Sequence, residues 1–125
     1  MKKQEAKFTT RVRKWLRDHG TGAYEIKHTR GSEHFNCREL KRHQRDCLLA
    51  AASPIGFAYK IPDDGVAYKP FDVVAFKGAR AYVVICYPEE FSVIPIAKME
   101  GWRAPTLSVR NARIIAEVTL RLEDL

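Results

Sequence analysis

The feature that most limits the fold of this chain is a pair of apolar segments in its second half, 71–77 and 79–87, both rich in Val, Ile, Phe and Tyr. Such residues favour β-strands, and Lys77-Gly78 is a turn signal between them, so the two segments predict a β-hairpin. The longer one is interrupted by Arg80 and falls far short of the roughly 20 apolar residues of a membrane span. We therefore expect a sheet protein with no membrane segment.

The residues at the start of the chain show helical periodicity instead. The apolar positions recur at spacings of three and four, which predicts a helix over 4–19 that stops at Gly20. Glu5 lies three residues before Phe8 and seven before Val12. This acidic residue is therefore expected on the buried edge of the helix and not on its solvent face.

A second helix is expected over 37–52, with Asn36 as a candidate cap and Ser53-Pro54 as the stop. Gln44 falls inside its apolar stripe, four residues after Leu40 and four before Leu48. A polar amide at such a position needs hydrogen-bond partners if it is buried. Gln44 is therefore a candidate site residue, although for Gln44 alone, as for Glu5 alone, an ordinary boundary position is the favoured explanation.

The remaining patterns predict short strands over 23–29, 56–61 and 91–96 and a last helix over 108–118. No linker or shift in composition divides the 125 residues. We therefore expect a single α/β domain over 1–125, with a sheet flanked by helices.

Charge gives the first indication of function. The chain has 22 Lys and Arg against 15 Asp and Glu, a net charge of +7 and a pI near 9.5. A small basic domain is often built to bind nucleic-acid phosphates, although a solvated basic surface is the simpler reading. The candidate phosphate contacts are Arg11, Arg13, Lys14, Arg30, Lys41, Arg42 and Lys69.

The cysteines argue against a disulfide scaffold. Cys37, Cys47 and Cys86 are odd in number and contain no Cys-x-x-Cys pair, which favours a reducing, cytoplasmic setting. A zinc site built from nearby His and Cys side chains lacks the paired spacing that such sites show.

Glu25 and Lys27 form the central candidate constellation. Residues two apart on a strand point to the same face, roughly 6.5–7 Å apart along it, so the two side chains are expected side by side. A carboxylate can hold a divalent cation, and a neighbouring ammonium can orient a water or neutralise a phosphate. A solvated strand edge is the competing explanation of the same pattern.

Asp72 is a second candidate acid, because it follows Lys69-Pro70-Phe71 and opens the apolar run 73–76. Strand interiors disfavour Asp, and a buried carboxylate is costly unless it is paired or bound to a metal. A strand-end Asp that caps a turn is an equally good interpretation. With Glu5, Glu25, Lys27 and Gln44, Asp72 completes a set of five residues that a shared site would explain.

Some of these residues also carry a family resemblance. Glu25-Ile-Lys27-His-Thr29, followed by Phe35, Leu40 and His43-Gln44, resembles the strand-to-helix stretch of the P-D-(D/E)-x-K nuclease superfamily, and most of all the RecU-type Holliday junction resolvases. The resemblance covers about 5–49 and, more loosely, the β-rich part to about 96. It implies a restriction-endonuclease-like mixed sheet flanked by helices. It also implies that Glu25 is a metal ligand, Lys27 the catalytic lysine, Gln44 a supporting residue and Glu5 the first-helix acid.

The chain departs from the family pattern at one point. The superfamily places an Asp between the first helix and the E-x-K strand, and here only Gly20-Thr21-Gly22 fills that gap. We expect Asp72 to supply the missing carboxylate through a rearranged strand order. Asp63 or Asp64 could also serve, although their Pro-Asp-Asp-Gly setting is typical of a turn.

The resemblance implies a magnesium-dependent DNA endonuclease that hydrolyses phosphodiester bonds, with Mn²⁺ as a substitute and branched DNA as a possible substrate. A homodimer is implied in the same way, because matched cuts need two-fold symmetry. An incomplete metal site would leave a nucleic-acid-binding module that keeps the nuclease fold. A protein-interaction domain with no nucleic-acid role is the third class.

Overall fold

The structure is a computed structural model that describes residues 2–63 and 69–125, and the side chains from residue 7 onward within that range. The helices are α1 (Lys2–His19), α2 (Arg42–Ala52), α3 (Ile96–Gly101) and α4 (Val109–Ile115), with short 3₁₀ turns at Cys37–Glu39 and Leu122–Asp124. The strands are β1 (Ala23–His28), β2 (His34–Asn36), β3 (Phe57–Lys60), β4 (Val73–Phe76), β5 (Ala81–Cys86), β6 (Glu90–Pro95), β7 (Thr106–Ser108) and β8 (Val118–Arg121).

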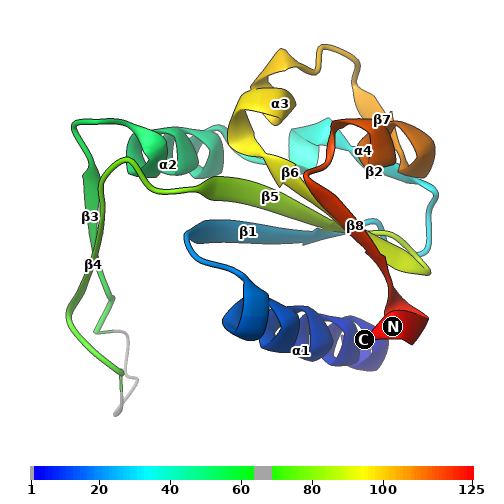
Figure 1. Ribbon diagram of the computed structural model, residues 1–125, viewed down its shortest axis with the longest axis horizontal. Coiled ribbons are helices and arrows are strands. Elements are labelled where there is room, and N and C mark those ends of the chain that lie inside the picture. Colours follow the sequence, from blue (N-terminus) through cyan, green and yellow to red (C-terminus); the bar gives the residue numbers. More distant parts are fainter. Residues whose placement is uncertain (1, 64–68) are drawn as a thin grey trace.

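A four-stranded mixed sheet in the order β1-β5-β6-β8 forms the centre of the molecule. β1 runs parallel to β5, and the other two pairings are antiparallel. Helix α1 covers one face, while α2, α3 and α4 lie on the other (Figure 1). The coarse prediction of an α/β protein with a mixed sheet between helices is therefore confirmed.

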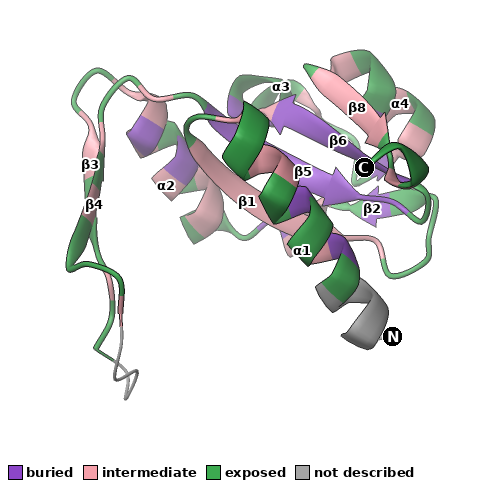
Figure 2. Ribbon diagram, turned by 60° about the horizontal axis from the view of Figure 1, so that its bottom comes forward, coloured by how far each residue is buried: buried purple, intermediate pink, exposed green. Residues whose placement is uncertain are grey.

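Strand β5 is the core of this arrangement, because helices cover it on both sides. All six of its residues are buried, which Figure 2 shows as the continuous purple of β5 and β6. Val83 and Ile85 pack on the α2 side, and Tyr82 and Val84 on the α1 side. Burial on both faces explains why this strand has an unbroken apolar sequence rather than an alternating one.

The predicted first helix is confirmed, since α1 ends one residue before Gly20. Phe8 and Val12 are buried against the sheet, as the periodicity requires. The Gly20 N–H closes the helix by donating to the Leu16 carbonyl at 2.7 Å. Among the described residues, no helix is both long and apolar enough to cross a membrane.

The predicted hairpin of 71–77 and 79–87 is wrong. β4 pairs with β3, and β5 belongs to the central sheet between β1 and β6. The reason lies at the expected turn, where the Gly78 N–H donates to the Ser53 carbonyl and the Ala79 N–H to that of Ala51. These bonds fasten the chain to the end of α2 and direct it into the core instead of back along β4.

The two strands β3 and β4 form an arm that extends from the rest of the molecule (Figure 1). Phe57 pairs with Phe76 at its base, and Lys60 pairs with Val73 toward its outer end. Figure 2 shows that the arm is mostly exposed. Residues 57–63 and 69–76 are called the β3–β4 arm below.

The predicted second helix is divided in two. Leu40 has extended backbone angles (φ −83°, ψ 98°) and separates the 3₁₀ turn Cys37–Glu39 from α2. Asn36 does act as a cap, but of the 3₁₀ turn, since its side chain accepts from the Arg38 N–H at 3.0 Å. The predicted last helix is also shorter than expected, because Ser108 caps α4 and the chain enters β8 at Val118.

Candidate functional site

Glu25 and Lys27 project side by side from β1, as their spacing predicts. Alternate residues of a strand face opposite sides, so Tyr24 and Ile26 pack toward α1 while Glu25 faces α2. Lys27 Nζ lies 3.6 Å from Glu25 Oε1, with 19% of the lysine side chain and 32% of the glutamate side chain exposed. The ion pair is thus partly buried and still open to a ligand from solvent.

Gln44 joins this pair from the first turn of α2. Its Nε2 donates to Glu25 Oε1 at 2.8 Å, and its Oε1 accepts from the Lys41 N–H at 2.9 Å. The second bond is half of a capping box at the start of the helix. Gln44 therefore connects the helix start to the Glu25 carboxylate, which gives the polar residue in the apolar stripe both of the partners it needs.

Asp72, which is expected to share a metal ion with Glu25, makes no contact with it among the described residues. It lies in the β3–β4 arm, next to the outer end of β4, where its carbonyl accepts from the Ile61 N–H at 2.7 Å. Its side chain is 79% exposed and lies 3.0 Å from Lys69 Nζ. Because β4 belongs to the arm and not to the central sheet, Asp72 is a strand-end residue paired with a nearby lysine.

The other expected acids also lie away from Glu25 or outside the described side chains. Glu5 belongs to α1, on the opposite face of the sheet from Glu25, and its side chain lies outside those the structure describes. Asp63 pairs with Lys69 in the arm, and Asp64 lies outside the described residues. Of the five predicted site residues, the structure brings together Glu25, Lys27 and Gln44.

A cavity of about 380 Å³ opens beside Lys27, toward the C-terminal end of β1. Its charged lining side chains are Lys27, Arg30, Lys41 and Glu39. Glu39, in the 3₁₀ turn before α2, is an acid that the sequence reasoning missed, because a continuous helix over 37–52 gave no reason to aim it at β1. The cavity has an excess of positive charge, which suits an anionic ligand.

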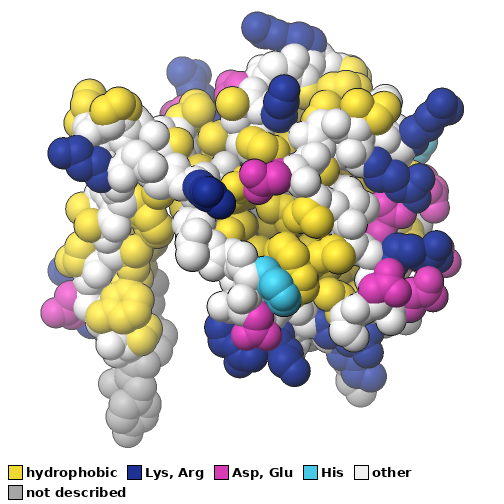
Figure 3. Space-filling view, in the orientation of Figure 1, with side chains coloured by type: hydrophobic (Ala, Val, Ile, Leu, Met, Phe, Trp, Pro, Cys, Tyr) yellow, Lys and Arg dark blue, Asp and Glu magenta, His cyan; other side chains and the backbone are white. Residues whose placement is uncertain are grey.

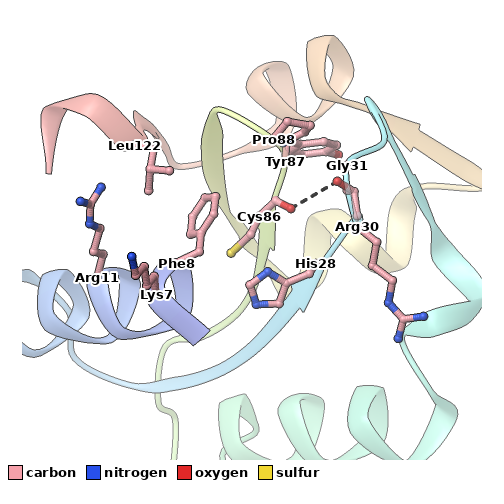
Figure 4. Close-up of a pocket in the computed structure, with 11 residues that line it drawn as sticks. Lys7, Phe8, Arg11, His28, Arg30, Gly31, Cys86, Tyr87, Pro88 and Leu122 are labelled. Carbon is pink, nitrogen blue, oxygen red and sulfur yellow. Dashed lines mark hydrogen bonds between the residues drawn. The ribbon is translucent and has the colours of Figure 1, made fainter. Parts of the chain in front are cut away.

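A second cavity of about 350 Å³ lies between α1 and the same end of β1 (Figure 4). Lys7, Arg11 and Arg30 are among its lining residues, and no Asp or Glu lines it among the side chains that the structure describes. The His28 ring contacts Phe8 edge-on at 5.9 Å and bonds through Nε2 to Thr9 Oγ1 at 2.9 Å. Arg30 lines both cavities, so the positive surface continues around the end of β1.

Cys86 faces this second cavity but is not a candidate nucleophile. Burial raises the pKa of its thiol to about 12, and the thiolate is the reactive form of cysteine. The neighbouring Thr29 hydroxyl donates to the Cys86 carbonyl at 3.4 Å. The side chains at this end of β1 therefore offer a ligand positive charges and hydrogen-bond donors.

The predicted phosphate contacts are dispersed around these cavities. Arg11, Arg30 and Lys41 line one or both of them, and Arg13 lines a separate groove near β1. Lys14 and Arg42 are exposed on α1 and α2. Lys69 is the exception, since it lies between the carboxylates of Asp63 and Asp72 in the arm.

No three His, Cys, Asp or Glu side chains gather in a metal-binding group within the part of the chain that the structure describes. Glu25 is the carboxylate that could hold a cation at the constellation on β1. Its described contacts, with Gln44 and Lys27, are both made through Oε1. Magnesium is often held by one or two carboxylates together with substrate phosphates and water. With Glu25 as its single protein carboxylate, this site fits the case of one carboxylate.

Comparison of the chain with protein-family models, with curated proteins and with solved structures gave no match in any of the three.

Proposed function

We propose that this domain is a metal-dependent nuclease that hydrolyses phosphodiester bonds in DNA. The observation that carries the proposal is the meeting of Glu25, Lys27 and Gln44 beside a positively charged cavity. These are three of the residues on which the resemblance to the P-D-(D/E)-x-K nucleases rests. A carboxylate, an ammonium group and a surface for phosphate are the parts that metal-assisted phosphodiester hydrolysis requires.

Gln44, Glu25 and Lys27 would each have a separate role in the hydrolysis. Gln44 fixes the Glu25 carboxylate through its 2.8 Å bond, so that its second oxygen can hold a cation. Lys27 is within reach of the same point and would donate to a non-bridging phosphate oxygen as negative charge develops there. Mg²⁺, or Mn²⁺ in its place, supplies Lewis-acid activation of the phosphate and of the attacking water when bound.

The expected reaction is attack of water on phosphorus, with cleavage of one P–O bond and release of a hydroxyl end and a phosphate end. Arg30 and Lys41, which line the cavity beside Lys27, would hold the flanking backbone phosphates. Phosphate contacts of this kind position a duplex without reading its sequence. Branched DNA enters this proposal only through the resemblance to Holliday junction resolvases.

A second candidate function is nucleic-acid binding without hydrolysis. One observation favours it: among the described side chains, Glu25 is the single carboxylate in contact with Lys27 or Gln44. A cation held by one protein carboxylate depends on the substrate for most of its ligands. Under this alternative Lys27, Arg30 and Lys41 bind phosphate, and Glu25 only orients Lys27.

The two functions are separated by a cleavage and binding assay on supercoiled plasmid, linear duplex and a four-way junction, each with Mg²⁺, Mn²⁺ or EDTA. For the nuclease we expect metal-dependent cleavage that Glu25→Gln and Lys27→Met each reduce at least a hundredfold. The matched controls are Glu123→Gln and Lys98→Met, which change exposed residues and should keep wild-type activity.

Salt-dependent DNA binding without cleavage in any metal supports the binding module instead. In that case Lys27→Met should weaken binding and lower the salt dependence of the affinity. If the protein does not bind DNA at low salt, both proposals are wrong.

A further inference from the structure

Among the residues that the structure describes, no strand pairs with the outer edge of β1. β1 is the end strand of the four-stranded sheet, and β5 is its neighbour. The Ala23 N–H donates to the Arg80 carbonyl and the Thr29 N–H to the Cys86 carbonyl, so the odd-numbered residues bond to β5. In a parallel pair the alternate residues point their N–H and C=O groups the other way, which directs those of Tyr24 and Ile26 to the open edge.

An apolar groove of about 680 Å³ runs along this edge, between the body of the molecule and the β3–β4 arm. Tyr24 and Ile26 of β1 line one side, and Phe57, Tyr59 and Phe76 line the side formed by the arm. Figure 3 shows hydrophobic side chains exposed on the body of the molecule and on the arm beside it. Polar and charged side chains, Arg13 and Arg17 of α1 among them, also line the groove. A largely apolar surface beside such a strand edge is typical of an interface.

The charges on β1 identify the occupant. We propose that this edge pairs with the β1 edge of a second copy of the chain, antiparallel and centred on Ile26. In that register Glu25 stands opposite Lys27 of the second copy, and Lys27 opposite its Glu25. Opposite charges directly across an antiparallel pair stabilise it, and like charges destabilise it.

The neighbouring registers are disfavoured by the same charges. Moving the two-fold axis by one residue toward the N-terminus sets Glu25 against Glu25, and moving it the other way sets Lys27 against Lys27. A shift that exchanges the two faces of one strand would place the charged side chains against the apolar α1 side. The pattern Glu25-Ile26-Lys27 is therefore complementary to itself in one register, as an isologous interface requires.

This pairing joins the two central sheets into one and covers part of the groove. It also places Glu25 of both copies on one face as diagonal neighbours, a separation that long side chains can span. The second copy thereby supplies another carboxylate next to Lys27, in addition to Glu39, which lines the cavity beside Lys27 in each chain. The interface is inferred from the edge and its charges, and it does not depend on the proposed hydrolysis.

Charge reversal tests the register. Size-exclusion chromatography with light scattering, or sedimentation, should give a dimer of the 14.3 kDa chain. Glu25→Lys and Lys27→Glu each turn two attractive pairs into repulsive ones and should weaken dimerisation about tenfold or more. The double variant Glu25→Lys/Lys27→Glu restores complementarity and should dimerise like the wild type. It should also lose any cleavage, so the assembly and the proposed function fail or succeed separately.

Cysteine cross-linking tests the same register without changing a charge, in a Cys37→Ser/Cys47→Ser background that keeps the buried Cys86. At the two-fold axis the Ile26 Cα atoms of the two copies would be about 5.5 Å apart, within the range of a disulfide. Ile26→Cys should therefore give a covalent dimer on oxidation. Tyr24→Cys is the matched control on the same face, since its two copies would be about 14 Å apart along the strands.

Several results would overturn the proposal. One is a wild-type protein that stays monomeric at its highest soluble concentration. Another is a dimer that both single reversals leave intact, and a third is cross-linking of Tyr24→Cys as readily as Ile26→Cys. The proposal would also be overturned if the groove bound DNA or an extended peptide and the protein did not self-associate, because the edge would then belong to another partner.

Discussion

Removal of the Gln44 side chain tests how the candidate site is held together. Gln44→Ala deletes the acceptor for the Lys41 N–H at the start of α2 and the donor to Glu25. Loss of a helix-capping bond costs about 1 kcal/mol. A hydrogen bond to a charged group contributes about 1.5–3 kcal/mol, which we reduce to about 1 because a third of the Glu25 side chain is exposed. The expected loss in the free energy of unfolding is about 2 kcal/mol.

Urea denaturation followed by circular dichroism measures this loss, and the corresponding fall in Tm is about 6–10 °C for a chain of this size. Asp46→Ala is the control in the same helix, since Asp46 is 66% exposed and lies 3.9 Å from Arg42. A surface pair of this kind contributes well under 1 kcal/mol. A Gln44→Ala variant as stable as Asp46→Ala would refute the view that Gln44 ties α2 to β1.

Gln44→Glu separates the two bonds, because it keeps the capping acceptor and sets a carboxylate against Glu25. Like charges raise the pKa of one carboxyl in the folded state, so the folded variant binds a proton more tightly than the unfolded chain. Its stability relative to wild type should therefore rise as the pH falls through the carboxylate range. Destabilisation that does not change with pH would contradict the direct contact.

The remaining predictions concern two buried side chains and two exposed glycines. Tyr87→Phe should lower the free energy of unfolding by about 1–2 kcal/mol in urea titrations, since the buried Tyr87 hydroxyl donates to a carbonyl of β7 at 2.8 Å. Alkylation and mass spectrometry should find Cys47 labelled and Cys86 spared in the folded protein. Burial raises the Cys86 pKa from 9.0 to about 12, so stability should fall as the pH rises through that interval. Gly22→Ala should destabilise more than Gly78→Ala: both have positive φ, but a Cβ on Gly22 would lie 2.1 Å from a backbone oxygen, and one on Gly78 would meet nothing within 4 Å.

The sequence predicts well those elements whose signals are local. Periodicity and Gly20 define α1. The six apolar residues of β5 predict a strand whichever strands pair with it. The pairing partners of the strands are a different matter, because they depend on bonds made far along the chain. The backbone does bend at Lys77-Gly78, but two bonds from there to the end of α2 send β5 into the core and not into a hairpin with β4.

The same distinction applies to the site. Glu25 and Lys27 share a face because of a two-residue spacing, and Gln44 reaches them because its place in an apolar stripe aims it at the sheet. Asp72 is expected at the site because it opens an apolar run and because the family pattern lacks an Asp before Glu25, but neither signal shows that β4 pairs with β3 and not with the central sheet. Glu39 was missed because the break at Leu40 depends on the extended backbone of that residue, which propensity does not indicate.

The pairing of Ala23–His28 with Ala81–Cys86 has a consequence for how the protein is made. During synthesis, the strand that carries Glu25 and Lys27 emerges long before its neighbour, and until then it has no sheet to join. Contacts between such distant segments form late and slow the search for the native state. A nascent chain stopped after α2 would contain Glu25, Lys27 and Gln44 and would still lack the surface that orders them.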